Sequence, residues 1–549
     1  MSVETLVAHF RYDGLTMTIH RRDLLKLAGS SMAIGAIPLT AAASSSGHAL
    51  NQQWLSSFLN VRNFGATGDG KTIDTPAINR AIATAASSGG GTVVIPAGVY
   101  ACYSIRLKSN VSLYLDQGAT ILAASTPIEG TTSGYDAAEP QGAWERYQDY
   151  GHNHWHNSLI WGEDLTNISI FGPGLIWGKG LSRGHGEDKD LPDTKAPGVG
   201  NKSIALKHCT NIILRDFSIL QGGWFGILAT GVDNLTIDNL KIDTNRDGMD
   251  IDCCRNVRVS NCTVNSPWDD GICPKSSYAL GYARPTENLT ISNCFVTGAY
   301  DLGSVLDGTW KQTSSGPKKY FTGRIKCGTE SNGGFKGITI TNCVFERCMG
   351  FALETEDGAI CEDITFSNIA MRELRGAPFF LRLGARLRGP AGTRPGTLRR
   401  IMLTNITSSG AGQLPSILAG IPNHPVEDIK INNLYLEQTG GAVAAMAALN
   451  PPEKADGYPE PTMFGDLPAT GVFLRHARNV EMSNVEIVTQ SLDARPAFWL
   501  EDVDGADFFH LRVPKNAPAF DLRSVKNFRS FGSQALKDIS FEEEQSRKI

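Results

Sequence analysis

Short segments of alternating apolar and polar residues recur along the chain, each followed by Asn or a close relative. The pattern appears as NLTIDNLKI at 234, NVRVSNCTV at 256, NLTISNCFV at 288 and GITITNCVF at 337, and it returns at 363, 428 and 479. Alternation over this length is typical of β-strands. Where nothing is inserted, as between 234 and 256, the spacing is about 22 residues, and repeats of this length indicate a solenoid.

The repeat predicts an all-β fold, a single-stranded right-handed parallel β-helix. One coil cannot bury its apolar face alone, whereas a stack of coils can. The strands of each coil would pair in parallel with the coils above and below, about 4.8 Å away. A leucine-rich repeat is the main alternative, but the Leu spacing and the helical halves that it needs are absent. The recurring Asn would lie at one corner of successive coils, where its amide can hydrogen-bond its neighbours and tolerates a left-handed turn. These residues are Asn239, Asn261, Asn293, Asn342, Asn368, Asn433 and Asn484.

The segment before the repeats predicts a cap for the first coil. Residues 74 to 85 read as a short amphipathic helix opened by Asp74 and Thr75. Such a helix would cover the exposed edge that a solenoid must protect. We expect one solenoid domain from about 58 to about 535 and a C-terminal tail at 536–549. Long loops on a rigid scaffold tend to form binding walls, and the main excursions are expected at 128–157, 278–287, 309–323 and 449–468.

Residues 1 to 49 are predicted to be an export signal. Arg21 and Arg22 precede an apolar stretch that runs from 24 to 43, a pattern that resembles a twin-arginine signal. The alternative is a chance Arg-Arg pair in a basic N-terminus. Met17 is a candidate for the true start, because residues 1 to 16 resemble no signal region. No other stretch reaches the roughly 18 apolar residues that span a bilayer. We therefore expect a periplasmic or secreted protein that uses the twin-arginine export machinery and has no stable membrane insertion.

The composition narrows the classes of ligand. Hydrophobic residues make up 41% of the chain and charged residues 19%, which is typical of a globular protein. A formal net charge of −5 offers no basic footprint for nucleic acid, so an acidic ligand needs local basic residues. The 11 cysteines form no CxxC pair and are not spaced like a disulfide framework, so we predict no such framework. No His or Cys cluster has the spacing of metal ligands, so we predict no metal or cofactor. Cys262, Cys294 and Cys343 each follow an Asn and are expected to stack as small buried residues.

The densest polar runs are TNRDGMDIDCCRN at 244–256 and WDDGICPKSS at 268–277. Asp247 and Asp269 are 22 residues apart, one coil by the local period, so we expect them to stack on adjacent coils with Asp270 beside them. Carboxylates this close cannot all stay ionised, so at least one pKa should be raised. Such a set supplies the acid and the base of glycoside hydrolysis. The alternative is that these aspartates form turns or bind a structural cation such as calcium.

Three motifs together resemble one family. NRDGMD resembles the Asn-Thr-Asp-Gly motif of glycoside hydrolase family 28, the polygalacturonase family, and WDDGICPKSS resembles its Asp-Asp motif with the following Lys-Ser. GRIKCGTESNGGFKGITITN at 323–342 resembles its Arg-Ile-Lys segment and the strand after it. The motifs occur in family order and the capping segment matches as well, so the resemblance covers nearly the whole mature chain.

The resemblance implies catalytic roles for the three aspartates. Asp269 would be the general acid that protonates the leaving oxygen. Asp247 and Asp270 would hold and deprotonate the attacking water, and the configuration of the sugar would be inverted. The resemblance also implies that Arg324 and Lys326 bind the carboxylate of a uronic acid beside the cleavage point.

Strand geometry agrees with the expected binding role. Residues 324 and 326 differ by two, so alternation in a strand puts both on one face. Arg suits the planar carboxylate of a uronic acid. The alternative is a solvated pair on an exposed strand. Lys275, the Lys of the Lys-Ser pair, is a further candidate for substrate binding.

The sequence also departs from the family near the predicted centre. Between the aspartate pair and Arg-Ile-Lys the family has a Gly-His-Gly motif, whereas this chain reads AYDLGSVLDGTW at 299–310, with Leu302 or a neighbour in the place of His. Arg246 replaces the Thr of Asn-Thr-Asp. The departures leave open which sugar is recognised and whether Asp301 or Asp307 takes part. Together with the long loops, they favour exo action or a mixed substrate such as rhamnogalacturonan over plain endo-polygalacturonase activity.

The sequence therefore predicts a glycoside hydrolase that cleaves uronic-acid linkages in a pectic polysaccharide. Two other functions stay open. A polysaccharide lyase on the same fold would need a Lys or Arg base, for which Lys275, Arg324 and Lys326 are candidates, and usually calcium. A non-catalytic glycan-binding β-helix is the third possibility, because the family His is missing.

Overall fold

The computed structural model describes residues 8–12, 15–19, 58–125, 134–183, 193–313, 321–534 and 536–549. The chain divides into two units, Met1–Leu55 and Ser56–Ile549. In the first unit, β1 (Ala8–Tyr12) pairs antiparallel with β2 (Leu15–Ile19), the strand that contains Met17. Arg21, Arg22 and the apolar stretch of the predicted export signal lie outside the described residues. Within the described ranges, no helix is long and apolar enough to cross a membrane.

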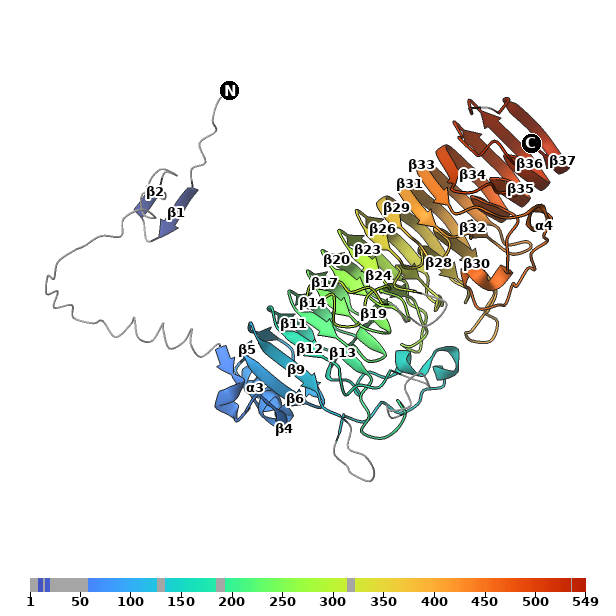
Figure 1. Cartoon of the computed structure of the whole chain (residues 1–549). Helices are drawn as coiled ribbons and strands as arrows, with labels where there is room; N and C mark the ends of the chain where they lie inside the picture. Colours follow the sequence, from blue (N-terminus) through green and yellow to red (C-terminus); the bar gives the residue numbers. More distant parts are fainter. Residues whose placement is uncertain are drawn as a thin grey trace, which may run out of the picture. The chain divides into compact units, whose positions relative to one another are not determined.

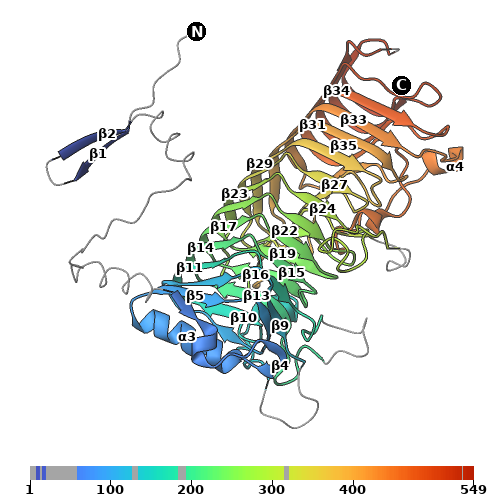
Figure 2. The same ribbon diagram turned by 60° about the vertical axis from the view of Figure 1, so that its left-hand side comes forward.

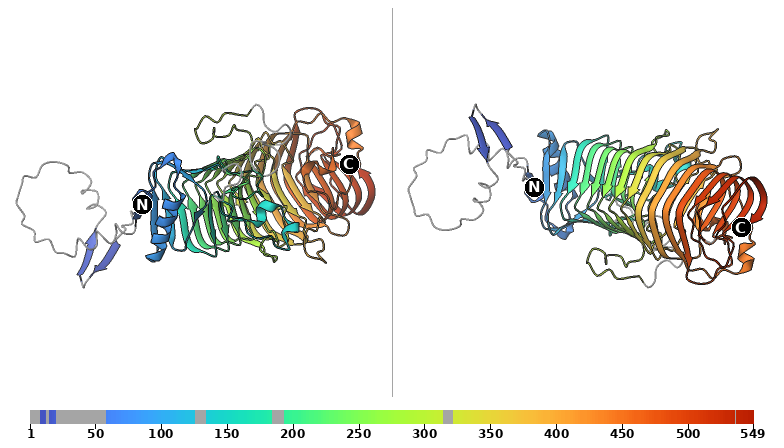
Figure 3. Two further views of the ribbon diagram at one scale, coloured as in Figure 1. Left: turned by 90° about the horizontal axis from the view of Figure 1, so that it is seen from below. Right: turned by 90° about the horizontal axis from the view of Figure 1, so that it is seen from above.

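The second unit is a parallel β-helix, a stack of coils whose strands pair with the same strands one coil further on (Figure 1). Up to residue 346 each coil has short strands separated by turns, and these strands form three rows. From β29 (Ile360–Arg372) onward, strands of neighbouring rows merge, because both β26 and β27 pair with β29. Figure 2 and Figure 3 show the same order of coils from other sides.

The first row contains β7 (Ile105–Arg106), β10 (Ile160–Glu163), β13 (Lys202–Lys207), β16 (Phe225–Thr230), β19 (Asp247–Asp252), β22 (Ile272–Lys275), β25 (Lys326–Cys327), β28 (Phe351–Thr355), β30 (Phe379–Leu383) and β32 (Ser416–Ala419). The second row contains β3 (Phe58–Asn60), β5 (Gly91–Ile95), β8 (Val111–Leu115), β11 (Thr166–Phe171), β14 (Thr210–Arg215), β17 (Asp233–Asp238), β20 (Arg255–Ser260), β23 (Thr286–Ser292) and β26 (Phe335–Thr341). The third row contains β4 (Asp69–Ile73), β6 (Gly98–Cys102), β9 (Ala119–Ala123), β12 (Leu175–Trp177), β15 (Ser218–Leu220), β18 (Lys241–Asp243), β21 (Thr263–Asn265), β24 (Phe295–Thr297) and β27 (Val344–Glu346). The later long strands are β31 (Thr397–Ala411), β33 (Val426–Gln438), β34 (Val472–Thr489), β35 (Phe498–Phe509) and β36 (Phe520–Phe531).

The core is a column of apolar side chains inside the coils. Leu235, Val257, Leu289 and Ile338 are register partners on four successive strands, and each is at most 1% exposed. Alternation therefore places every second residue of the repeat inside, as the sequence predicts. Cys262, Cys294 and Cys343 lie in the same core, which confirms their predicted burial. All eleven cysteines belong to the described part of the chain, and each is buried and outside any disulfide.

The recurring Asn residues form the predicted corner. All seven have a left-handed φ, between 53° and 57°. Asn433 donates a hydrogen bond to Asn405, and Asn405 donates one to Asn368, at 2.9 and 3.0 Å. The ladder is partly made by Asp instead, since Asn261 donates to Asp238 at 2.8 Å. The corner thus combines a turn conformation that suits Asn with hydrogen bonds between coils.

Both ends of the stack are covered. Helix α3 (Thr75–Ser87) lies at the end formed by β4 and β5 (Figure 2), and it packs Ile78 and Ile82 against the first coils, as predicted. Asp74 precedes the helix, but its carboxylate accepts hydrogen bonds from the N–H groups of Thr67 and Gly68 and from no helix N–H. At the other end, the segment expected as a tail contains β37 (Ile539–Lys548), which pairs antiparallel with β36. Such a strand occupies the open edge of the last coil.

Two of the predicted excursions contain short helical turns. The described helical turns outside the coils are η1 (Val61–Phe64), η2 (Glu145–Tyr147), η3 (Tyr150–Asn153), α4 (Ala444–Ala447) and η4 (Pro461–Phe464). Of these, η2 and η3 lie in 128–157, and η4 lies in 449–468. The 449–468 excursion is held by two buried arginines, Arg382 on β30 and Arg475 on β34. Arg382 donates to the carbonyl oxygen of Lys454, and Arg475 to that of Pro451, both at 3.0 Å. Phe464 is buried against Phe473. This excursion is therefore a fixed wall.

Candidate active site

The three predicted catalytic aspartates lie on adjacent coils of the first row. The third-row strands β18 and β21 pair at an offset of 22 residues (241 with 263), whereas β19 and β22 pair at 23 (249 with 272). One additional residue therefore lies in the turn between β21 and β22, which carries Asp269 and Asp270. The predicted stacking of Asp247 on Asp269 is wrong by this one residue. Asp270 lies level with Asp247, and its carbonyl oxygen accepts a 2.9 Å hydrogen bond from the N–H of Gly248.

The carboxylates nevertheless converge. One oxygen from each of Asp247, Asp269 and Asp270 lies within 4.8 Å of the other two. Asp247 and Asp270 are 5% and 1% exposed, whereas 27% of the Asp269 side chain is exposed. Asp269 therefore lies at the mouth of the cluster and the other two at its base.

The buried aspartates differ in their electrostatic surroundings. Burial, together with the charges of Asp269 and Asp250, holds the pKa of Asp247 well above its usual range. Burial acts in the same direction on Asp270, but the cations of Lys326 and Arg324 outweigh it and hold the pKa of Asp270 below its usual range. One carboxyl of the cluster thus keeps its proton while its neighbour stays ionised, as the close spacing predicts.

Arg324 and Lys326 lie on one face, as predicted, and both contact Asp270. The Nε of Arg324 is 2.8 Å from an oxygen of Asp270, and the ammonium of Lys326 forms an ion pair with the same carboxylate. A second nitrogen of Arg324 lies 3.0 Å from the carboxylate of Glu460, which belongs to the 449–468 excursion. Both basic residues are at most 3% exposed. Their positive charges are therefore engaged by the protein, and a substrate carboxylate would have to compete with Glu460 for Arg324.

Lys275 is not at the surface of the site. It is the last residue of β22, is 4% exposed, and its ammonium lies 3.1 Å from Glu330 and 3.8 Å from Asp250. The ammonium therefore balances buried carboxylates beneath the cluster. Direct contact with a sugar would need these ion pairs to open, and the expected role of Lys275 in substrate binding stays a prediction.

The region that replaces the family's Gly-His-Gly motif lies outside the first row. The N–H of Gly271 donates to the carbonyl oxygen of Arg324 at 2.8 Å, so the Arg-Ile-Lys coil stacks directly on the aspartate coil. Residues 299–313 form an excursion, in which Leu302 is 37% exposed and Asp301 pairs with Lys311 at 2.9 Å. Asp307 accepts a hydrogen bond from the N–H of Thr309. Arg324 therefore occupies the coil after the aspartates, and Leu302 and its neighbours, predicted to stand in the place of the family His, lie in a separate excursion.

Two further residues contact carboxylates at or beside the cluster. His152, from the first excursion, is 4% exposed, and its Nε2 lies 3.2 Å from Asp250 on β19. Arg246 lies 3.3 Å from the carboxylate of Asp269. The sequence marks Arg246 as a departure from the family motif, but alternation and spacing do not indicate that it reaches Asp269. The contact of His152 crosses 98 residues and has no signal in a local pattern.

The charges disfavour the calcium alternative. Clustered carboxylates suit calcium, but the most buried carboxylate of this cluster already has two cations, Arg324 and Lys326, as partners. A divalent ion would add positive charge beside both. The cluster is therefore better suited to acid–base chemistry than to holding a cation.

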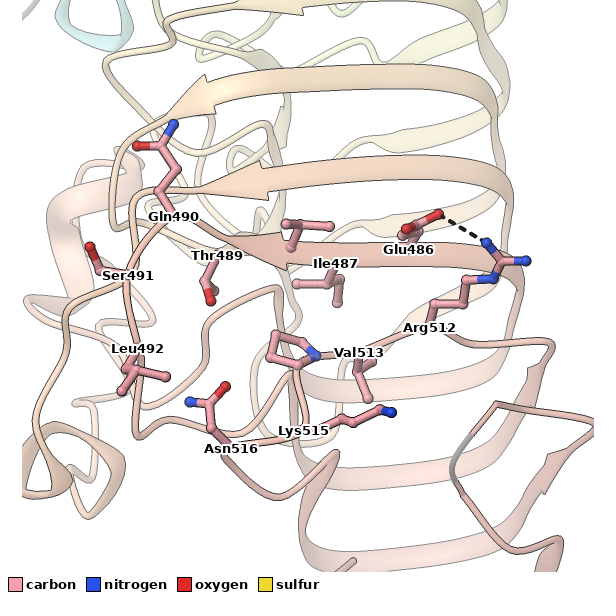
Figure 4. A pocket seen from close by; sticks show the side chains of 12 residues that line it. Glu486, Ile487, Thr489, Gln490, Ser491, Leu492, Arg512, Val513, Lys515 and Asn516 are labelled. Carbon is pink, nitrogen blue, oxygen red and sulfur yellow. Dashed lines mark ion pairs between the residues drawn. The ribbon is translucent and has the colours of Figure 1, made fainter.

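A groove lies on the later coils, away from the aspartates, between the end of β34 and the segment after β35 (Figure 4). It has a volume of about 480 Å³. The one carboxylate among its lining residues, Glu486, lies 3.8 Å from Arg512. This groove lacks the converging acids of the first row and is no candidate for acid–base chemistry.

Comparisons with known proteins agree with the fold and the family. Residues 58–170 match the family described as rhamnogalacturonase A/epimerase, pectate lyase-like, and residues 176–315 match the right handed beta helix region. A "Probable polygalacturonase" of Vitis vinifera is 28% identical over 265 residues, which are 45% of this chain and 51% of the relative. An exo-poly-alpha-D-galacturonosidase of Dickeya chrysanthemi is 27% identical over 45% of this chain and 47% of its own. The chain thus spans about half the length of these curated relatives.

Solved structures extend the agreement over most of the chain. The family 28 exopolygalacturonase of Yersinia enterocolitica superposes with a TM-score of 0.58 at 20% identity, over 84% of this chain and 79% of that one. The exopolygalacturonase of Thermotoga maritima gives 0.53 at 16% identity, over 91% and 99%. At these identities the likeness concerns the fold. The likeness confirms the predicted fold, and the sequence relatives confirm the resemblance to polygalacturonases: the chain is a right-handed parallel β-helix protein similar to polygalacturonases.

Proposed function

We propose that the protein is a glycoside hydrolase that cleaves galacturonosyl or related uronic-acid linkages in a pectic polysaccharide. The observation that carries the proposal is the convergence of Asp247, Asp269 and Asp270 within 4.8 Å, with the pKa of Asp247 raised and that of Asp270 lowered. Environments that separate the pKa values of neighbouring carboxyls keep one protonated and another ionised at the same pH, so the cluster can both give and accept protons. The relatives named polygalacturonase and exo-poly-alpha-D-galacturonosidase support uronic-acid linkages as the target.

The exposure of each aspartate supports its role. Asp269, at the mouth of the cluster, is placed to donate a proton to the leaving oxygen. Asp270 is ionised and is the stronger candidate for the base that takes a proton from water. Asp247, with its raised pKa, orients that water as a neutral carboxyl. This division refines the roles that the resemblance implies, in which both residues act as base.

The stereochemical outcome can be decided by measurement. The resemblance implies inversion, whereas carboxyl groups closer than about 6.5 Å are more typical of retaining enzymes. The closest oxygens here lie within 4.8 Å. Proton NMR of the first product distinguishes the two, because inversion releases the anomer opposite to that of the substrate.

Two excursions support exo action. The 449–468 excursion reaches Arg324 through Glu460, and the first excursion reaches Asp250 through His152. Excursions that reach the coils of the aspartates would restrict the length of chain that the site can take. Release of mono- or disaccharides from the chain end is the expected result, and release of long internal fragments from polygalacturonate would contradict it.

The decisive experiment is product analysis by mass spectrometry on a panel of pectic glycans. Hydrolysis adds one water to the products, whereas a lyase gives unsaturated products that absorb in the ultraviolet and loses its activity with a chelator if calcium is required. Asp269→Asn should lower the rate by about 10²–10⁴-fold, the usual contribution of a general acid. Full activity of this variant on a cleaved glycan would refute the assigned role. If no uronate-containing glycan is cleaved, a glycan-binding function replaces the hydrolase proposal.

We also propose that the protein is exported by the twin-arginine machinery to the periplasm or beyond, where it would meet cell-wall polysaccharide. Arg21, Arg22 and the apolar residues after them support this. Replacing both arginines by Lys should retain the protein in the cytoplasm, which cell fractionation measures. Unchanged export of that variant would argue against a twin-arginine signal.

A further inference from the structure

Beside Asp269 lies a surface that combines basic and aromatic side chains. Arg246 precedes β19, and its guanidinium lies 4.7 Å above the ring of Trp224, which is 5% exposed. One nitrogen of Arg246 donates a 3.0 Å hydrogen bond to the carbonyl oxygen of Arg183. The aromatic face and this carbonyl hold the guanidinium in place, and a preorganised guanidinium loses less entropy when it binds a ligand.

The contact between Arg246 and the cluster leaves room for exchange. The two side chains of the Arg246–Asp269 pair are 26% and 27% exposed and lie 3.3 Å apart. Ion pairs with this exposure are weak. By contrast, Arg324 is 1% exposed and has bonds of 2.8 and 3.0 Å to two protein carboxylates. The Arg246–Asp269 pair is therefore easier for a carboxylate from solvent to exchange than the buried pairs of Arg324.

Trp268 completes the surface. It directly precedes Asp269, is 38% exposed, and the guanidinium of Arg183 lies 5.5 Å from its ring centre. An exposed indole offers a flat apolar face to the C–H side of a sugar ring, and its own position is supported by the cation on it. A ring that stacks on Trp268 would lie beside Asp269, with Arg246 within reach of a carboxylate on that sugar.

We propose that Arg246 and Trp268, supported by Arg183 and Trp224, form a subsite that binds the carboxylate and the ring of a uronic acid beside the cleavage point. This rests on the proposed function, and it assigns carboxylate recognition to a residue other than the buried Arg324 and Lys326. The ligand class is an unesterified uronic acid, because a methyl ester removes the charge that a guanidinium recognises.

Binding can be measured apart from cleavage. The full chain carrying Asp247→Asn, which slows turnover, is titrated by calorimetry with trigalacturonate and with its methyl ester. Adding Arg246→Gln should weaken trigalacturonate binding by about tenfold or more, the usual effect of losing a charge-assisted hydrogen bond. Binding of the methyl ester should change by less than about twofold, because that ligand never formed the bond. Arg246→Lys keeps the positive charge but loses the planar guanidinium that can bind a carboxylate through two nitrogens, and it should weaken trigalacturonate binding by an intermediate factor.

Two further variants make the test specific. Trp268→Ala should weaken both ligands by the same factor, since stacking does not depend on the carboxylate charge. Arg512→Gln, in the groove of Figure 4, is the matched control: Arg512 is 66% exposed and also pairs with a carboxylate. It should leave binding unchanged, and a loss confined to this variant would place the carboxylate receptor in that groove and overturn the proposal.

The remaining outcomes separate the subsite from the proposed function. Equal weakening of both ligands by Arg246→Gln, or no weakening, would overturn the subsite. If Arg246→Gln does not fold, as judged by its thermal transition, the Lys variant decides between the same outcomes. A chain with native Asp247 that binds trigalacturonate through Arg246 but never cleaves it would support the subsite and refute the hydrolase proposal. A chain that binds neither ligand would refute both.

Discussion

Glu356, which follows β28, is a buried carboxyl whose proton should control stability. It is fully buried, and neither carboxylate oxygen has a hydrogen-bond partner among the described residues. Its nearest cation, the Nε of Arg382, lies 3.8 Å away. Burial outweighs the effect of Arg382 and raises the pKa of Glu356 from 4.5 to about 8. The variant Glu356→Gln keeps the shape of the side chain and removes the ionisation.

The size and sign of the effect follow from this pKa. The folded protein holds the proton more tightly than the unfolded chain, so the stabilising contribution is complete below pH 4.5 and is lost as the pH rises through about 8. A shift of one pKa unit corresponds to roughly 1.4 kcal/mol, so ionising Glu356 in the folded protein lowers the free energy of unfolding by about 5 kcal/mol. Glu356→Gln should therefore match the native chain at about pH 5 and exceed its stability by several kcal/mol at about pH 9.

The assay is denaturant unfolding of both chains at several pH values. The informative quantity is the difference between their free energies of unfolding, because other titrating groups largely cancel in it. Glu362→Gln is the matched control. Burial would raise the pKa of Glu362, but hydrogen bonds from Arg399 and Arg400 hold it below its usual range, so this variant should lose stability at neutral pH. If the difference in free energy of unfolding between Glu356→Gln and the native chain does not change with pH, Glu356 does not have a raised pKa in the folded protein.

Two other predictions concern stability. Asp270→Asn should cost about 3–5 kcal/mol, because it leaves the buried cation of Lys326 without its ion pair. The loss should shrink as the pH falls below about 4, where Asp270 of the unfolded native chain binds a proton while the folded carboxyl, whose pKa is lowered, stays ionised; an unfolding free energy equal to that of the native chain would contradict this. Asn405→Ala should cost about 1–2 kcal/mol because Asn405 has a left-handed φ of 55°, in addition to the lost hydrogen bonds between coils. Asn405→Gly should lose mainly these hydrogen bonds, because Gly adopts this φ without strain. Equal shifts in the melting temperature of the two variants would argue against a conformational cost.

The sequence by itself determined the architecture. The alternation in NVRVSNCTV and its relatives fixes which side chains enter the core, since a strand exposes every second residue to one side. The spacing of 22 residues and the Asn at each corner fix the length of a coil and its turn, because few residues other than Asn and Gly adopt a left-handed φ at low cost. The capping helix is equally local, with its apolar face and its Asp-Thr start visible in twelve residues. The same regularity placed Asp247, Asp269 and Asp270 at one place in the stack.

The closing strand β37 and the exact register of the site could not be obtained in this way. An antiparallel edge strand carries no repeat, so Ile539–Lys548 gave no signal that it covers the last coil. The additional residue before β22 lies in an irregular turn, and only the observed pairing of 249 with 272 shows that Asp270 is the partner of Asp247. A shift of one residue exchanges the faces of a strand, so small irregularities in a turn decide which side chains meet.

The tertiary structure alone decided the charges around the aspartates. Whether Arg324 and Lys326 face a substrate or a protein carboxylate depends on burial and on Glu460, which is 136 residues away in the chain. The same holds for His152 against Asp250, and for Arg246 between Trp224 and Asp269. A repeat in the sequence predicts the structure of single coils. The charges that act on a site come from every segment that packs against it, including segments far away in the chain. For this protein, the sequence therefore determined where the acids lie. Burial and the packing of neighbouring coils and distant excursions determined which of them keep a proton and which cations remain accessible to a substrate.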